Sequence, residues 1–477
     1  MKKPFSSFNR RALIWAVGIL GLFGSHQSAA IADERTDPAR KQFLIVAPNS
    51  FHEALKEYVA YKKKLRPTEL VSLEDVLKTT EGVDDPERLK RFLYNAWRKR
   101  SLGYVLLVGD VDVTPVRYMV LDRNTPAAFD YAFYPSDLYY ADLAKQDGGF
   151  DDWNGNKDGY HAGYFGEVHG EHNKKDAINF DQIDYRPEIA VGRWPVSTVE
   201  EVKIVAAKTM AYEEGVRDGT HPGLRRAEFF HVGGWVDARA RLDGLAQKMP
   251  AGWEADRNFF RDGNANFKTP PPDEKRLLEA LNKGTALAVH VGHGSDASWD
   301  GCFSIDNLAK LKNADRLPVL FSAGCSTAYF APLAPYGAYV DVEGKEHRGT
   351  DQGEVFKAPP PPPSPYQKGK YNPTGLGEQA IKGGPNGAVV YIGCNTGGQP
   401  CALSLVEGFL MALRESEQPV VGDCWASAVR YYYDKENLAG LVPNDDWYPP
   451  SIFFQAMKYM YFGDPTLPFA APETKKD

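Results

Sequence analysis

The sequence has no surplus of positive charge and no hydrophobic run long enough to cross a bilayer comfortably. Its 56 lysine and arginine residues stand against 63 aspartate and glutamate residues, for a formal net charge of -7. Because binding to a phosphate backbone needs a basic surplus, nucleic acid is not an expected partner. The most apolar segment, residues 12–23, is shorter than the roughly 20 residues of a membrane-spanning helix. At 477 residues, the chain exceeds one ordinary hydrophobic core, which predicts two packed units.

The apolar segment 12–23 has the flanks of an export signal. Basic residues precede it, and small residues including Ala30 and Ala32 follow it. This order is typical of a signal peptide, here residues 1–32, although a retained membrane anchor is the alternative. We therefore expect a secreted or periplasmic protein with no stable membrane span after cleavage.

Cysteine is absent from the N-terminal half of the chain. In an exported protein, an odd number of cysteines leaves at least one thiol outside any intramolecular disulfide. A free thiol suits catalysis, and the alternative is that every cysteine is a small buried core residue. The five residues are Cys302, Cys325, Cys394, Cys401 and Cys424.

Short apolar runs alternate with helical patterns along the chain. Residues 42–48 and 103–110 are predicted strands, and residues 51–65 and 86–100 have helical spacing. Such alternation is typical of a parallel sheet covered by helices, so an α/β fold is expected.

A polar stretch divides this alternation into two units, each expected to have its own parallel sheet with flanking helices. We predict an N-terminal α/β subdomain at residues 33–215 and a second domain at residues 222–470. Residues 331–373, which include the run Pro359–Pro363, are predicted to be a long surface insertion. This insertion is either a mobile loop without function or a flap over a site formed by the preceding loop.

Two predicted strands of the second unit end at residues with catalytic side chains. The strand at residues 285–291 stops before His293, and the strand at residues 317–323 stops before Cys325. Catalytic groups collect at the carboxyl ends of parallel strands. An imidazole can take the proton of a thiol, and glycine-flanked loops offer backbone N–H groups to an oxyanion. His293 and Cys325 therefore form a candidate dyad; a zinc site with His290 and a small-molecule hydrolase are weaker alternatives.

These segments resemble those of a known family. Residues 291–296 (VGHGSD) with Trp299, and residues 317–325 (LPVLFSAGC), are similar to the catalytic His and Cys segments of gingipain-type peptidases, peptidase family C25, which are relatives of caspases. The resemblance continues in order through residues 104–110, 136–140, 187–193 and 462–467. It implies a caspase-like second domain and a cysteine endopeptidase acting on protein or peptide substrates, without a cofactor for the chemistry.

By this resemblance, His293 acts as acid and base and Cys325 forms the acyl-enzyme, with the N–H groups of Gly294 and Cys325 as the oxyanion hole. The chain departs from the family pattern in two places. Gly324 replaces the alanine before the catalytic cysteine, a small change expected to alter little. The glutamate that the family places before a Gly-Gly pair is missing from residues 231–234 (HVGG). A catalytically silent, caspase-like binding module is therefore the alternative.

The predicted cleavage specificity depends on one residue. Extending the resemblance without gaps from residues 233–234 places Asp243 where arginine-specific members have the aspartate of their pocket. A carboxylate there would pair with a guanidinium and predicts cleavage after Arg, then Lys. The alternative is a solvated helix residue.

A structural calcium ion is also possible. Oxygen-bearing side chains alternate in a turn-rich stretch, an arrangement that suits hard cations. A polar loop without a metal is the alternative. The candidate ligands are Asp152, Asn154, Asn156, Asp158 and Glu167.

Overall fold

The structure is a computed structural model of the chain. It describes residues 41–120, 133–153, 183–263, 267–357, 360–442 and 448–470. The predicted signal peptide lies outside the described residues. Within the described part of the chain, no helix combines the length and the apolar character that crossing a membrane requires.

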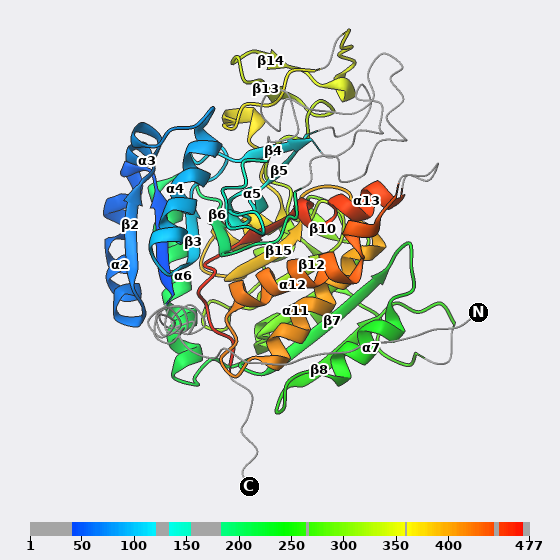
Figure 1. Ribbon diagram of the computed structural model, residues 1–477. Coiled ribbons are helices and arrows are strands. Elements are labelled where there is room, and N and C mark those ends of the chain that lie inside the picture. Colours follow the sequence, from blue (N-terminus) through cyan, green and yellow to red (C-terminus); the bar gives the residue numbers. More distant parts are fainter. Residues whose placement is uncertain are drawn as a thin grey trace, which may run out of the picture.

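One large sheet forms the centre of the molecule (Figure 1). Its ten strands have the order β2-β1-β3-β6-β16-β15-β12-β9-β7-β8. Every neighbouring pair is parallel except β15 and β16. The strands are β1 (Gln42–Ala47), β2 (Thr68–Ser72), β3 (Leu102–Val108), β6 (Ala190–Trp194), β7 (Arg226–Gly233), β8 (Glu254–Phe259), β9 (Leu287–Gly292), β12 (Val319–Ala323), β15 (Val390–Cys394) and β16 (Tyr459–Phe462).

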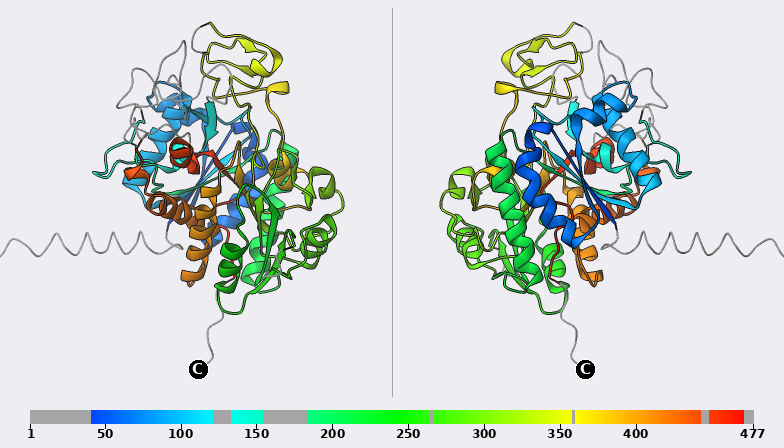
Figure 2. Two further views of the ribbon diagram at one scale, coloured as in Figure 1. Left: turned by 90° about the vertical axis from the view of Figure 1, so that its right-hand side faces the viewer. Right: turned by 90° about the vertical axis from the view of Figure 1, so that its left-hand side faces the viewer.

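Helices cover both faces of this sheet, as the side views show (Figure 2). Side chains alternate along β1, with Leu44 and Val46 in one core cluster and Phe43 and Ile45 in the other. Burial on both faces is typical of parallel sheets and explains the continuous apolar runs. The α/β class is therefore confirmed. One face of the sheet is covered by α3 (Leu73–Thr79), α4 (Asp85–Lys99), α7 (Arg239–Gln247), α11 (Leu403–Glu415) and α12 (Val421–Lys435). The other face is covered by α2 (His52–Leu65), α6 (Val199–Arg217), α8 (Glu274–Lys283) and α10 (Leu376–Lys382).

The helix ends follow local capping signals. Thr198 and Glu201 form a capping box at the start of α6. Asp84 and Asp273 accept backbone N–H bonds at the starts of α4 and α8. These side chains satisfy N–H groups that have no partner inside the helix, which fixes where each helix begins.

The strands of the two predicted units join at β16. This last strand is antiparallel to β15, with Ile392 opposite Tyr461, and parallel to β6, with Arg193 opposite Phe462. The strands on the two sides of the β15–β16 pair therefore run in opposite directions. As a result, the carboxyl ends of β9, β12 and β15 share one edge of the sheet, away from those of β1, β3 and β6. The predicted boundary falls between α6 and β7.

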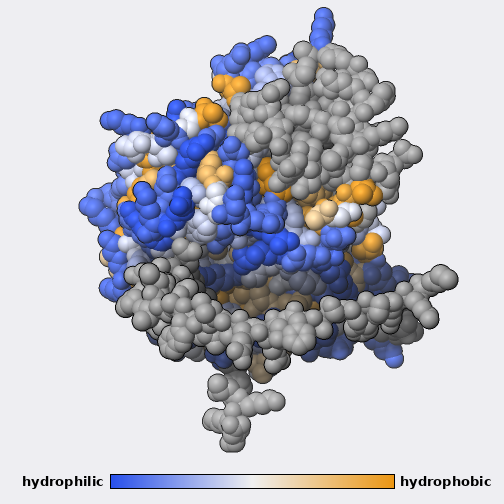
Figure 3. Space-filling model, in the orientation of Figure 1, coloured by the Kyte–Doolittle hydropathy of each residue, from blue (hydrophilic) through white to orange (hydrophobic). Residues whose placement is uncertain are grey.

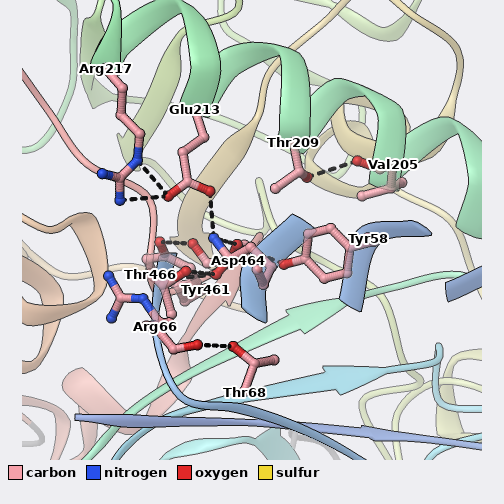
Figure 4. Close-up of polar contacts among 11 residues, drawn as sticks. Tyr58, Arg66, Thr68, Val205, Thr209, Glu213, Arg217, Tyr461, Asp464 and Thr466 are labelled. Carbon is pink, nitrogen blue, oxygen red and sulfur yellow. Dashed lines mark hydrogen bonds and ion pairs between the residues drawn. The ribbon is translucent and has the colours of Figure 1, made fainter. Parts of the chain in front are cut away.

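A buried ion cluster ties α2 and α6 to the segment after β16 (Figure 4). The ammonium of Lys62 lies 2.6 Å from a carboxylate oxygen of Glu213 and 2.8 Å from one of Asp464. The hydroxyl of Tyr58 donates to Asp464 at 2.7 Å. All these side chains are fully buried. The cluster thus links the first long helix to the end of the described chain.

The insertion at residues 331–373 packs on the N-terminal half, beside the hairpin of β4 (Arg117–Val120) and β5 (Phe133–Ser136) (Figure 1). Backbone N–H groups of Val116 and Phe133 donate to carbonyls of Pro365 and Ala334 in the insertion. It contains the short pair β13 (Tyr339–Val340) and β14 (Glu346–His347). Its described residues do not line the pocket around Cys325, which gives no support to the alternative of a flap over that pocket.

The remaining elements are short. They include α5 (Leu138–Ala141), α9 (Ile305–Leu308), α13 (Tyr448–Phe454), β10 (Ser298–Trp299) and β11 (Phe303–Ser304). The face of the molecule seen in Figure 3 is largely hydrophilic where it is coloured, with apolar residues in small groups.

Candidate active site

The structure brings His293 and Cys325 together. Strands β9 and β12 are parallel neighbours, and Val291 lies opposite Ala323 at their carboxyl ends. His293 directly follows the last residue of β9, and Cys325 lies two residues after the end of β12. Both therefore reach the same edge of the sheet, and both line one pocket.

This pocket has an empty volume of about 450 Å³, part of it open to solvent. Loops after β7, β9, β12 and β15 form its walls, together with the start of α11. Pockets in this size range hold small ligands or single side chains of a bound peptide. The pocket lies at the edge of the sheet where the sequence predicted catalytic groups to collect.

The loop after β15 closes over the candidate nucleophile. The backbone N–H of Gly398 donates to the sulfur of Cys325 at 3.3 Å. The N–H of Ser326 donates to the carbonyl of Thr396 at 2.8 Å, which anchors the turn at Cys325 to the same loop. Sequence reasoning missed this loop, although a Gly-Gly pair at residues 397–398 soon after a buried strand was an available signal.

Cys325 differs from the other cysteines. None of the five forms a disulfide, and only Cys325 is partly exposed. Burial raises the pKa of Cys302 and of Cys394 to about 12, and raises that of Cys424 well above its ordinary value. Thiols held in the protonated form are poor nucleophiles. Reactivity toward electrophiles is therefore expected at Cys325.

The two residues of the predicted oxyanion hole, Gly294 and Cys325, lie in neighbouring loops. A methyl group on Gly294 would lie 3.3 Å from the carbonyl oxygen of Cys325, so the two loops touch. Among the described residues, no acceptor is found for the N–H group of Gly294 or of Cys325. Both groups are thus available to a substrate oxyanion.

A polar network supports the turn from beneath. The hydroxyl of Ser322 lies 2.8 Å from Nδ1 of His290 and accepts from the N–H of Gly324 and the hydroxyl of Thr327. His290 is fully buried and stacks on Trp299 with ring centroids 4.7 Å apart. Burial lowers the pKa of His290 to about 3, so the ring is neutral. It forms a buried support beneath the turn at Cys325.

The same ring explains why Gly324 precedes the cysteine. A methyl group on residue 324 would lie 2.7 Å from Cε1 of His290, closer than carbon atoms pack. The small size shared by glycine and alanine is therefore not the whole explanation, because the buried ring leaves room only for glycine.

Comparison with known proteins places the chain in a family. A model described as peptidase family C25 matches residues 36–470. The chain belongs to peptidase family C25. The C25 match spans both halves of the sheet and includes the loops of the pocket.

Two curated relatives are gingipains of Porphyromonas gingivalis. Gingipain R2 is 21% identical over 313 residues, which cover 62% of this chain and 33% of that protein. Gingipain R1 is 22% identical over 161 residues, which cover 31% of this chain and 15% of that protein. The chain thus spans about a third or less of the length of these relatives.

Solved structures show the same fold. The crystal structure of the Arg-specific cysteine proteinase gingipain R has a TM-score of 0.59 at 16% identity and covers 92% of this chain and 80% of its own. The complex of the pro- and mature domains of RgpB from Porphyromonas gingivalis has a TM-score of 0.57 at 16% identity, with coverages of 91% and 81%. The gingipain-type, caspase-like architecture expected from the resemblance is confirmed.

His231 occupies the region where the C25 resemblance led us to expect a glutamate. Its Nδ1 lies 3.0 Å from the carbonyl of Val291, and its Nε2 accepts from the N–H of Ala238 at 3.0 Å. Both ring nitrogens are therefore used within the loops. His293 is exposed, and among the described residues no hydrogen bond or ion pair joins its imidazole to a carboxylate. The missing orienting acid is thus not replaced by a described residue.

Asp243 does not reach the pocket of this C25 member. It lies on α7, where its carboxylate accepts from Arg257 at 3.0 Å and from Gln247 at 2.6 Å. It is absent from the pocket lining. The structure therefore favours the alternative of a paired helix residue on the surface.

The calcium candidate stays a prediction. Asp152 is the one candidate ligand that the structure describes; Asn154, Asn156, Asp158 and Glu167 lie outside the described residues. Within the described part of the chain, no group of three or more His, Cys, Asp or Glu side chains is arranged to hold a metal ion.

Proposed function

We propose that the protein is an exported cysteine endopeptidase that cleaves peptide bonds through Cys325 and His293. The observation that carries this proposal is the convergence of both side chains on one pocket, with the sulfur of Cys325 held by the N–H of Gly398. Membership of a peptidase family supports it. Its substrates are proteins or peptides, and its chemistry needs no cofactor.

In the proposed reaction, Cys325 gives its thiol proton to His293, and the sulfur attacks the scissile carbonyl carbon. The electron pair of the C=O bond moves to oxygen, where the N–H groups of Gly294 and Cys325 stabilise it. His293 then gives the proton to the leaving amine as the C–N bond breaks, which leaves a thioester on Cys325. A water molecule, deprotonated by His293, hydrolyses the thioester and restores the thiol.

The missing orienting acid is expected to lower the rate of catalysis, and it supports a second candidate function. A histidine without an orienting partner spends less time in the productive tautomer and orientation, so we expect a slow enzyme. A catalytically silent binding module is the second candidate, favoured by the same exposed imidazole. The expected preference for Arg or Lys depended on Asp243 and is not part of this proposal, because that carboxylate is paired outside the pocket.

The test is cleavage of a mixed peptide library by the purified chain beside three variants. We expect Cys325→Ala and His293→Ala to abolish cleavage, by at least about a thousandfold, because each removes a partner of the dyad. Cys424→Ala is the matched control, since its thiol is buried in the core, and it should cleave as the parent does.

Mass mapping after treatment with iodoacetamide should find modification at Cys325 and at no other cysteine. Parental cleavage by Cys325→Ala would refute the proposal. If no protein cleaves and peptide electrophiles fail to modify a Cys325 that iodoacetamide modifies, the binding module becomes the better account.

A further inference from the structure

We propose that the pocket beside Cys325 accepts an uncharged, apolar side chain from the substrate residue that precedes the scissile bond. This inference rests on the proposed peptidase function and names its substrate class. It differs from the preference for Arg and Lys that the sequence suggested through Asp243.

The walls of the pocket are apolar. Val236, Val291, Ala323, Ala402 and Leu403 contribute aliphatic side chains beside the dyad. No aspartate or glutamate is present among the described residues that line it. A hydrophobic wall of this kind gains free energy from burying aliphatic or aromatic groups.

The most buried polar side chain of the lining, His231, carries no charge. His231 is fully buried, and its pKa is lowered by burial, so the ring is neutral. Its two nitrogens are already engaged by Val291 and Ala238. The ring therefore offers neither a negative charge nor a free acceptor to a substrate cation.

Asp237, which directly follows the pocket residue Val236, is already paired. The guanidinium of Arg239 lies between Asp237 and Asp262, at 2.6 Å and 2.7 Å from their oxygens. It also lies over the rings of Phe260 and Phe267, at 4.2 Å and 4.6 Å from their centroids. Two acids and two aromatic faces are what a guanidinium-binding site provides. Here the chain's own Arg239, 1% exposed, fills that place.

Two further acids outside the pocket lining are also paired with arginines. Asp243 binds Arg257, and Glu407 binds Arg241. A lysine or arginine of a substrate would enter the pocket without a counter-charge, and burying an unpaired cation is unfavourable. An apolar side chain meets no such penalty.

An exposed indole stands at the pocket mouth. Trp235 lines the pocket and is 82% exposed, and its neighbour Val236 is 41% exposed. Adjacent exposed hydrophobic side chains beside a pocket can extend its apolar surface. Trp235 is therefore positioned to cover an apolar substrate group after it enters.

The experiment compares peptidyl acyloxymethyl ketones that differ only in the residue before the reactive ketone: Leu, Phe, Ala, Lys or Arg. The rate at which each modifies Cys325 of the full chain is followed by intact mass. We expect the Leu or Phe probe to react at least about tenfold faster than the Lys and Arg probes, the range in which a pocket discriminates side chains. Equal or faster reaction of the Arg or Lys probe would overturn the inference and leave the peptidase proposal standing.

Two variants sharpen the comparison. Val236→Asp places a carboxylate at an exposed position of the pocket and should raise the Arg-to-Leu rate ratio at least about tenfold. Asp243→Asn is the matched control, and the ratio should not change. A changed ratio in Asp243→Asn, or an unchanged one in Val236→Asp, would contradict the pocket assignment. If no peptidyl probe modifies Cys325 while iodoacetamide does, the peptidase proposal fails and this inference falls with it.

Discussion

Close contacts around Cys325 restrict which amino acids fit at single positions. Gly324 is the clearest example, because a methyl group there would meet the ring of His290 at 2.7 Å. That ring is held by Ser322 and Trp299, so it has little freedom to move. The glycine at position 324 is thus required by the histidine at position 290.

We predict that Gly324→Ala destabilises the protein by about 1–3 kcal/mol, the usual effect of overpacking a core, and slows alkylation of Cys325. The cost should fall in a His290→Ala background, because the clashing ring is gone. Urea unfolding of the parent, both single variants and the double variant measures this coupling. An equal cost of Gly324→Ala in both backgrounds would show that the contact is not the cause.

At the scale of elements, the ion cluster of Lys62, Glu213 and Asp464 joins α2 and α6 to the segment after β16. Burial alone would raise the pKa of Asp464. The ammonium of Lys62, with hydrogen bonds from Tyr58 and Thr466, outweighs burial and holds that pKa below its ordinary value. The carboxylate therefore contributes stability above the unfolded pKa of about 3.9, and that contribution is lost as the pH falls through the lowered folded pKa.

We predict that Lys62→Met lowers the free energy of unfolding by about 3–5 kcal/mol at pH 7, since it leaves buried carboxylates without a cation. The difference from the parent should shrink as the pH falls toward 4, because protonated carboxyl groups do not need the ammonium. Lys63→Met, at the exposed neighbouring position, is the control and should have little effect. A difference that stays constant with pH would argue against the cluster as its source. Denaturant unfolding at several pH values provides the measurement.

For the whole molecule, the decisive feature is that the last described strand, β16, lies in the middle of the sheet. β16 pairs with β6 of the first half and β15 of the second. Neither half has a complete sheet without it. The two predicted units are therefore expected to unfold together.

We predict one cooperative calorimetric transition for the full chain and no stable fold for residues 33–215 alone, because the edge of β6 would lose its partner. A chain that ends at residue 455 lacks β16 and should not fold, whereas one that ends at residue 470 keeps every described element. Two separate transitions, or native circular dichroism from the isolated N-terminal fragment, would contradict this view.

The sequence by itself determined the local structure and the identity of the candidate dyad. Continuous apolar runs predicted buried strands, and the helical spacing at residues 51–65 matches α2. Because a side chain at the end of a buried parallel strand must emerge at the sheet edge, His293 and Cys325 could be named without a structure. The order of motifs along the chain also indicated the family.

Only the tertiary structure decided how distant segments meet. It placed β16 between β6 and β15, brought Gly398 onto the sulfur of Cys325, and turned Asp243 toward Arg257. None of these follows from periodicity, which reports which residues are buried but not which strand or charge lies opposite. Strand order and ion pairing depend on contacts between residues far apart in the chain, and these form only when the whole sheet is assembled.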